Sequence, residues 1–329
     1  MRRWIALLFL PAALLVLAAA CAEEAEAPGP STATVEAEAT ATPPPGIELL
    51  VVDHNILHGL SNEDVEAQPD DRINERLQLI AVALAELRPQ IIFLQEVFVN
   101  EREGYPDVRD VLLAALGDDY TAVFGPLNGQ AIDGGGLGQM TLTRLPILST
   151  ENRSVGPVPG SVRAVHRVTV ETEIGPVDVY NVHLEGTEPD PQLAIDEIEN
   201  VLAFIRETRT GAGPVILAGD FNAQPGDPAI QALLEAGFVD VLAVGGDATC
   251  AAAGDPGCTS DTAPLGDNPE NLTSRRIDYI FVLAGEDLSL SIRSAQLFLN
   301  AAQPIGEGRL LWPSDHIGVQ AVLELREQR

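Results

Sequence analysis

The sequence predicts an α/β domain built as a four-layer sandwich, with two mixed β-sheets packed face to face and helices on the outer faces. Strand-like runs outnumber helical ones, and several alternate apolar and polar residues with a period of two, as strands with one buried face do. Residues 70–88 instead repeat apolar residues at steps of three and four and stop at Pro89, which is typical of an amphipathic helix. Elements of both kinds bury their apolar faces when helices cover two stacked sheets.

Further helices are expected at three places. Residues 106–116 and 191–206 show helical periodicity, and a short helix is expected at 228–236, where Pro228 takes the first helical position. The strand-like runs are interleaved with these helices from residue 47 to the C-terminal region. We therefore expect residues 47–329 to form one domain.

The first twenty residues predict a signal peptide. Arg2 and Arg3 precede an apolar run that extends to Ala20, too short and too close to the terminus to favour a spanning helix. The small residues before Cys21 resemble a bacterial lipobox, in which that cysteine becomes lipidated. They also satisfy the Ala-x-Ala rule of ordinary signal cleavage, so plain secretion is the alternative.

Residues 21–46 are expected to form a lipidated cysteine followed by a disordered tether. This stretch is rich in Ala, Glu, Thr and Pro and has almost no large apolar side chain, so it cannot bury enough surface to offset the entropy of ordering. The expected location is the bacterial cell envelope or the extracellular space, with the protein held at a membrane by its lipid.

The charge of the chain argues against tight binding to duplex nucleic acid. Nineteen basic residues, all arginine, stand against 49 acidic ones, for a formal net charge of −30. Such a field repels polyanions, and the arginines are scattered rather than clustered into a stripe. A phosphoester substrate and the membrane are the expected partners, and the protein is expected to be a monomer.

Two cysteines enclose a short loop. Cys250 and Cys258 are eight positions apart, and an exported chain meets an oxidising environment, so a disulfide between them is expected. A two-cysteine metal site is the alternative, although no histidine lies nearby in the sequence.

Polar side chains suited to catalysis follow a buried strand near residue 220. The apolar run 214–218 leads into Gly219-Asp220-Phe221-Asn222. Asp220 and Asn222 are two positions apart, so both side chains can point to one side of an extended backbone.

Other strand-like runs end or begin on similar residues. In chain order, these strand-end positions are Asn55, Glu96, His183, Asp220 with Asn222, Asp278, and Asp315 with His316. This ordered series resembles the endonuclease/exonuclease/phosphatase superfamily, which includes deoxyribonucleases, abasic-site endonucleases, bacterial sphingomyelinases and inositol-phosphate phosphatases. The resemblance spans about residues 47–325 and implies the sandwich fold described above.

The resemblance also implies a metal site. Glu96 is the principal ligand, with Asn55 beside it and Asp315 as a further or water-mediated ligand. Hard oxygen ligands of this kind suit Mg²⁺, and Mn²⁺ is an acceptable substitute.

The catalytic roles follow from the same resemblance. His316 contacts the phosphoryl group and is oriented by Asp278, while His183 lies on the other side of the phosphate and can protonate the leaving group. Asp220 and Asn222 correspond to water activation and phosphate positioning. The choice of general base between Asp220 and the histidines is left open.

Three more residues are expected to bind substrate. Arg163 lies where relatives often carry a phosphate-contacting arginine. Gln139 stands where the family usually has asparagine, which puts its substrate contact in doubt, and His58 follows Asn55 closely enough to line the pocket.

The sequence therefore predicts an exported, Mg²⁺-dependent phosphoesterase acting on a phosphomonoester or phosphodiester. Lipid headgroups, inositol phosphates or small nucleotides are the favoured substrates. The alternatives are an extracellular nuclease and a non-catalytic surface-binding lipoprotein that reuses the fold.

Overall fold

The computed structural model describes residues 46–57, 72–99, 107–127, 135–157, 162–186, 191–260, 270–271 and 273–328. They belong to one compact unit, Pro44–Arg329. The signal segment, the tether, Cys21 and His58 lie outside the described residues. None of the described helices is both long and apolar enough to cross a membrane.

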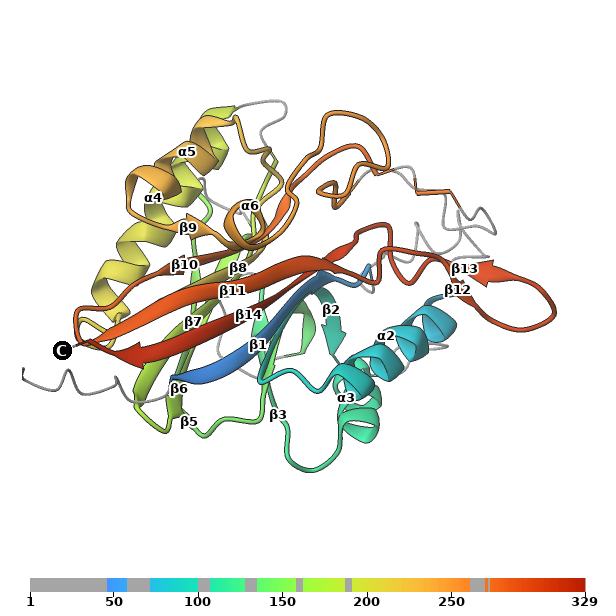
Figure 1. Cartoon of the computed structure of the whole chain (residues 1–329), viewed down its shortest axis with the longest axis horizontal. Coiled ribbons are helices and arrows are strands. Elements are labelled where there is room, and N and C mark those ends of the chain that lie inside the picture. Colours follow the sequence, from blue (N-terminus) through green and yellow to red (C-terminus); the bar gives the residue numbers. More distant parts are fainter. Residues whose placement is uncertain are drawn as a thin grey trace, which may run out of the picture. The chain divides into compact units, whose positions relative to one another are not determined.

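Two six-stranded mixed sheets form the centre of the domain (Figure 1). The first has the order β11-β14-β1-β2-β4-β3 and the second β5-β6-β7-β8-β10-β9. The pairs β1–β2 and β7–β8 are parallel and the other neighbours are antiparallel. The predicted sandwich is confirmed.

The strands of the first sheet are β1 (Ile47–Asn55), β2 (Ile91–Val99), β3 (Thr121–Pro126), β4 (Gly136–Thr143), β11 (Leu288–Phe298) and β14 (Gly318–Glu327). Those of the second are β5 (Ile147–Ser154), β6 (Ala164–Thr172), β7 (Gly175–His183), β8 (Val215–Asp220), β9 (Val239–Asp240) and β10 (Asp278–Leu283). A separate two-stranded sheet consists of β12 (Gln303–Pro304) and β13 (Leu310–Leu311).

Helices cover the outer face of each sheet. The first sheet packs against α2 (Ile73–Leu87) and α3 (Val108–Leu116), and the second against α4 (Pro191–Thr208) and α5 (Pro228–Glu235). A short helix, α6 (Val241–Gly245), contacts β11. The four predicted helices are therefore present, with boundaries shifted by up to three residues.

The layer between the sheets is apolar at one end and polar at the other. The apolar end is filled by side chains such as Val51, Phe93, Val179 and Ile216. Two positions further along β1, β2 and β7, the same inward face carries the polar residues Asp53, Gln95 and Asn181. On β8 the polar residue is Asp220, which follows the apolar Ala218. The polar end of this layer lies where β1, β2, β7 and β8 terminate.

Hydrogen bonds across the polar end join the two sheets. The side-chain nitrogen of Gln95 donates to Asp53 Oδ1 at 2.8 Å and to Asn181 Oδ1 at 2.9 Å. Asn181 Nδ2 in turn donates to the carbonyls of Leu94 and Met140 at 3.2 and 3.1 Å. Because Asn181 belongs to the second sheet and its partners to the first, we call these contacts the carboxamide tie.

Gln139 makes a second contact of this kind. Its side chain is fully buried, and its Nε2 donates to the Ala164 carbonyl on β6 at 2.8 Å. The contact seen for this residue links the two sheets, and its substrate contact stays a prediction.

The disulfide between Cys250 and Cys258 is present. This confirms the prediction and removes the alternative of a two-cysteine metal site.

Two buried histidines resist protonation. His54 packs edge-on against Phe298, with ring centroids 5.8 Å apart, and His166 lies between the sheets near Gly125. Burial lowers the pKa of each imidazole to about 3. Both rings are therefore neutral in the folded protein at neutral pH.

We predict that acid destabilises the domain partly through His166. In the unfolded chain, the His166 imidazole has its ordinary pKa of 6.5 and binds a proton below that pH, whereas in the folded protein it stays neutral down to about pH 3. The free energy of unfolding therefore falls as the pH drops from about 6.5 toward 3. One such group contributes about 1.4 kcal/mol per pH unit in this window. Urea unfolding of wild type and His166→Gln from pH 7.5 to 4.5 should show a shallower pH dependence in the variant.

The measurement at pH 7.5 serves as the control, since it reports the packing change alone. Parallel pH curves for the two proteins would contradict the prediction.

Candidate functional site

The polar end of the inter-sheet layer opens where two pairs of parallel strands stop. Asn55 ends β1, His183 ends β7 and Asp220 ends β8, while Glu96 lies within β2, directly after the residue that pairs with Asn55. Parallel neighbours terminate at the same edge of their sheet, so these side chains are gathered at one end of the sandwich.

A β-bulge turns Glu96 toward the site. Leu94 pairs with Met140 and Val97 with Gly138, so Gln95 and Glu96 together face the single residue between those partners. Glu96 has a φ of 55°, and both residues of the bulge point inward, since Leu94 and Val97 on either side pack outward. The bulge therefore supplies a half-buried carboxylate to the site, where a regular strand would turn it toward the helices.

Asp220 is the meeting point of the site. Its Oδ2 lies 3.0 Å from Asn55 Nδ2, 3.7 Å from His183 Nε2 and 3.8 Å from His316 Nε2. Its Oδ1 accepts a hydrogen bond from the backbone of Asn222 at 2.9 Å. The two histidine separations exceed a direct hydrogen bond and suit a bridging water or phosphoryl oxygen.

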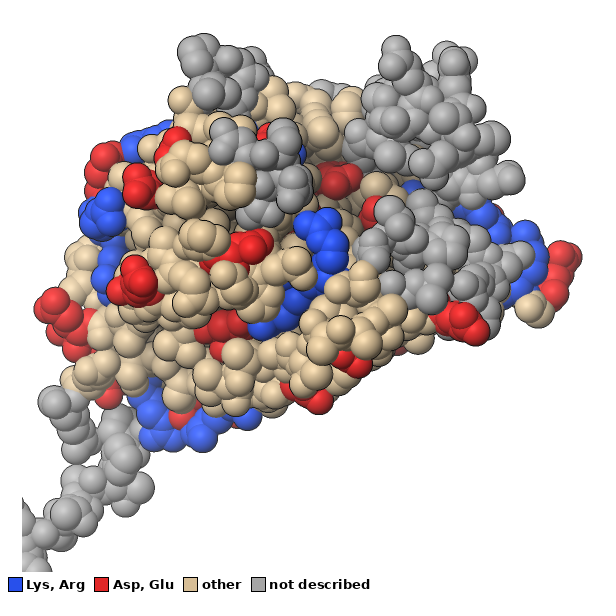
Figure 2. All heavy atoms as spheres, turned by 90° about the horizontal axis from the view of Figure 1, so that it is seen from above, with Lys and Arg blue, Asp and Glu red and all other residues tan. Residues whose placement is uncertain are grey.

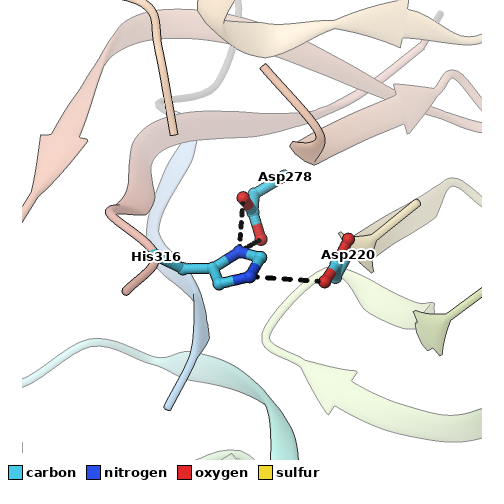
Figure 3. A group of neighbouring side chains, drawn as sticks. All are labelled: Asp220, Asp278 and His316. Atoms are coloured by element: carbon cyan, nitrogen blue, oxygen red, sulfur yellow. Dashed lines mark hydrogen bonds and ion pairs between the residues drawn. The ribbon is translucent and has the colours of Figure 1, made fainter. Parts of the chain in front are cut away.

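His316 is held by a carboxylate on the other side of its ring (Figure 3). Its Nδ1 lies 3.0 Å from both oxygens of Asp278. Burial opposes protonation, but the carboxylates of Asp278 and Asp220 more than offset it and raise the pKa of His316 well above the usual value. The ring is therefore an imidazolium whose Nε2–H points toward Asp220.

His183 has the opposite character. Burial lowers its pKa to about 4, and the Asp220 carboxylate only partly compensates. Among the described residues its Nδ1 has no hydrogen-bond partner. The site thus combines one charged and one neutral imidazole on either side of the same carboxylate.

Backbone conformation places the residues after β8. Gly219 has a φ of +146°, and a Cβ added there would lie 1.9 Å from the Val182 carbonyl of the neighbouring strand. Asn222 takes a left-handed φ of 50°, and its Nδ2 donates to the Leu184 carbonyl at 3.1 Å. This turn brings Asn222 back over Asp220.

The carboxylate oxygens of Glu96 and Asp220 fit a hard divalent cation. Asn55 Nδ2 donates to Glu96 Oε1 and to Asp220 Oδ2, both at 3.0 Å, so a neutral amide directly links the half-buried carboxylate of Glu96 and the buried one of Asp220. Burial raises the pKa of Glu96, and the Asn55 hydrogen bond only partly offsets it. A cation here would supply the missing positive charge.

The half-buried Asp315 lies close enough for its charge to contribute to the raised pKa of Glu96. Asp220, Asp278 and His316 also form a cluster whose ligand atoms lie within 4.8 Å of one another. Because the Nδ1 of His316 is already bonded to Asp278, the side of Asp220 facing Glu96 is the better cation site.

The structure brings the principal sequence-predicted residues together and places Arg163 beside them. Arg163 directly precedes Ala164, which pairs with His183. Its guanidinium contacts Glu185, with Nε 3.0 Å from Oε2. His58 is not among the described residues.

Other residues near the site are not predicted by the sequence patterns. Asp53, Gln95 and Asn181 each lie one or two positions before a site residue, and a polar residue inside a buried strand was the available signal. Ser260 lies with its Oγ 3.4 Å from His316 Nε2, and no local pattern distinguishes it from other loop serines.

Comparison with known proteins identifies the family. The sequence profile described as Endonuclease/Exonuclease/phosphatase family matches residues 54–316. The chain belongs to the endonuclease/exonuclease/phosphatase family. It is accordingly a hydrolase of the phosphoester type, in a family whose enzymes generally depend on divalent metals. None of the curated proteins compared with the chain matches it.

Solved structures of this family share the fold. An endonuclease/exonuclease/phosphatase family protein from Bacteroides thetaiotaomicron is 18% identical, with a TM-score of 0.64 over 85% of this chain and 96% of that one. A mannosyl-6-phosphatase from the same species is also 18% identical, with a TM-score of 0.62 over 84% and 99%. TDP2 from D. rerio, complexed with a single-strand DNA product, is 19% identical, with a TM-score of 0.61 over 84% and 98%.

We predict that Gly219→Ala disrupts the pairing of β7 with β8, because the added Cβ would overlap the Val182 carbonyl. The expected loss is about 3 kcal/mol or more of unfolding free energy, measured by urea titration. Gly226→Ala is the matched control, since its Cβ would have no neighbour within 4 Å. Equal unfolding midpoints for the two variants would show that the close approach at Gly219 is not required.

Proposed function

We propose that this protein is an exported, Mg²⁺-dependent phosphoesterase that hydrolyses small phosphoesters. The convergence of Asn55, His183 and His316 on the Oδ2 of Asp220, from both sheets, is the observation that supports this proposal most directly. It gathers a cation site, a charged donor and a neutral imidazole around one carboxylate, as phosphoryl transfer requires.

Glu96 and Asn55, with Asp315 nearby, would hold the ion, which neutralises phosphoryl oxygens when bound. The charged Nε2–H of His316 donates to a phosphoryl oxygen, and Asp278 keeps that ring oriented and protonated. Since His316 already carries its proton, it is not the base. Asp220 holds the attacking water through Oδ2 and accepts its proton.

His183 completes the reaction on the other side of the phosphate. Its ring is neutral, and the Nε2 position facing Asp220 can carry the hydrogen that makes a hydrogen bond to the departing oxygen. The proton that this oxygen finally takes is the one that Asp220 removed from the attacking water, so both the carboxylate and the neutral imidazole are restored.

A small substrate suits the charge of the surface. On the face shown in Figure 2, arginine and acidic side chains are interspersed, and the basic ones do not form a continuous stripe. Several arginines are also paired with carboxylates, including Arg163 with Glu185 and Arg153 with Glu207. Lipid headgroups, inositol phosphates and small nucleotides therefore fit better than duplex DNA.

The first experiment is a substrate panel in the presence and absence of chelator. It contains an inositol phosphate, sphingomyelin, bis-p-nitrophenyl phosphate, a nucleotide and plasmid DNA. We expect Mg²⁺-dependent turnover of a small or lipid phosphoester, with higher kcat/KM than for plasmid DNA at about 0.15 M salt, where charges are screened beyond about 8 Å. Full activity in excess chelator would contradict the proposal, and cleavage of plasmid DNA alone would favour a nuclease.

Glu96→Gln tests the cation site within the same assay. Removing the anionic ligand should lower activity at least 100-fold at low millimolar Mg²⁺, with part of the loss recovered at high Mg²⁺. The isosteric change keeps the hydrogen-bonding shape near Asn55, so a circular dichroism melt should resemble that of wild type. Unchanged Mg²⁺ dependence would show that Glu96 is not a ligand.

We also propose that Cys21 anchors the protein to a membrane. The lipobox-like sequence before it and the apolar-poor stretch after it support this assignment. In a bacterial host, wild type should partition with membranes and incorporate labelled palmitate, and Cys21→Ser should lose both properties. Recovery of wild type wholly in the soluble exported fraction, with a free amine on Cys21, would favour plain secretion.

A further inference from the structure

A row of three side chains leads away from the phosphoryl site. Ser260 forms isolated antiparallel β-bridges with both Arg275 and His316. We propose that Ser260 and Arg275 form an anion subsite that binds a second phosphate of the substrate, beside the phosphoryl group contacted by His316. This inference rests on the proposed function and specifies its substrate class as one carrying two phosphates.

The β-bridges place the three side chains on one face. Residues directly opposite each other in antiparallel pairs project to the same side. Ser260 and Arg275 exchange backbone hydrogen bonds of 2.9 and 2.8 Å, so this pairing is in register. With about 4.8 Å between neighbouring strands, the backbones of Arg275 and His316 are about 10 Å apart, a distance that a long arginine side chain can largely span.

Ser260 contacts the reactive end of His316. Its Oγ lies 3.4 Å from Nε2. A hydroxyl can donate one hydrogen bond and accept others, so Ser260 can also contact an oxygen of the substrate. This residue therefore links the phosphoryl site to the next position along the row.

The segment that carries Ser260 is fixed before any substrate binds. Thr259 Oγ1 accepts hydrogen bonds from the backbone of Ile277 and Asp278, both at 3.1 Å. The Thr259 carbonyl accepts another from Ile317 at 2.6 Å, and the disulfide closes at Cys258 directly before it. Such preorganisation reduces the entropy lost when a ligand is held.

Arg275 supplies the positive charge. It is half-buried, and within the described ranges no hydrogen bond or ion pair of its guanidinium is found. Its neighbour Arg276, in contrast, pairs with Asp240 and lies over the Tyr279 ring. A guanidinium without a carboxylate partner, next to a phosphoester site in a chain of net charge −30, is suited to bind a phosphate through paired N–H donors.

The test compares adenosine 5′-phosphate with adenosine 3′,5′-bisphosphate, using the full domain with Mg²⁺. Wild type should show at least a tenfold higher kcat/KM for the bisphosphate. Arg275→Gln should lower that value tenfold or more, mainly by raising KM, and should change the monophosphate value less than twofold. Ser260→Ala should show the same selectivity with a smaller effect, and Arg275→Lys should recover part of the loss.

Arg206→Gln is the matched control, because it removes the same charge from an exposed position on α4. It should leave both substrates unaffected. Equal losses on every substrate in Arg275→Gln, or no loss on any of them, would overturn the subsite while leaving the phosphoesterase proposal intact.

Two further measurements separate the remaining outcomes. The first uses a thymidine tetranucleotide to test whether the second phosphate belongs to a nucleic-acid strand. A tenfold loss of kcat/KM in Arg275→Gln on this substrate alone would support a subsite that binds a phosphate of such a strand. Calorimetric binding of the bisphosphate tests the subsite without turnover. If no phosphoester is hydrolysed, the proposed function fails, yet tenfold weaker binding by Arg275→Gln would still support the subsite, and unchanged or absent binding would overturn it.

Discussion

The carboxamide tie between the two sheets is the constraint on which the site depends. Glu96 and Asn55 come from one sheet and His183 and Asp220 from the other, so a shift of one sheet against the other would separate them. Apolar packing alone tolerates such sliding, because it has no preferred direction. Hydrogen bonds do not tolerate it, since a buried carboxamide left without its partner costs about 1–3 kcal/mol. The polar end of the core therefore fixes the register of the sheets to within the tolerance of a hydrogen bond.

The same arrangement explains how two histidines in one small site have opposite charge states. Both are buried, which by itself disfavours the imidazolium form. His316 is flanked by Asp278 on one nitrogen and faces Asp220 with the other, whereas His183 faces Asp220 alone and lies near Arg163, whose charge opposes its protonation. The additional carboxylates of Asp278 and, more weakly, Asp315 change the outcome. The charge state of each histidine is thus determined by the charged residues around it rather than by its residue type.

The sequence predicts the strands and the polar residues at their ends, but not the contacts that these residues make across the two sheets. Alternating apolar runs predicted where strands end, and the polar residues at those ends, Asp220 among them, did converge as expected. The prediction failed to foresee that Gln139 bonds to the backbone of another sheet, because a one-dimensional pattern shows that a residue faces inward and not what it meets there. The bulge at Glu96 was also hidden, since its effect depends on the register of the partner strand. Ser260 could not be found because its relation to His316 is set by pairings between segments distant in sequence.

The bulge in β2 has a consequence for how this fold can be altered. A strand of perfect alternation would be easier to build, and removing one residue between Leu94 and Val97 would restore that regularity. A regular strand would have one inward-facing residue here instead of two, so it could carry either Gln95 of the carboxamide tie or Glu96 of the site, but not both. Any redesign that makes this strand regular would therefore remove the cation ligand or the contact that aligns the sheets.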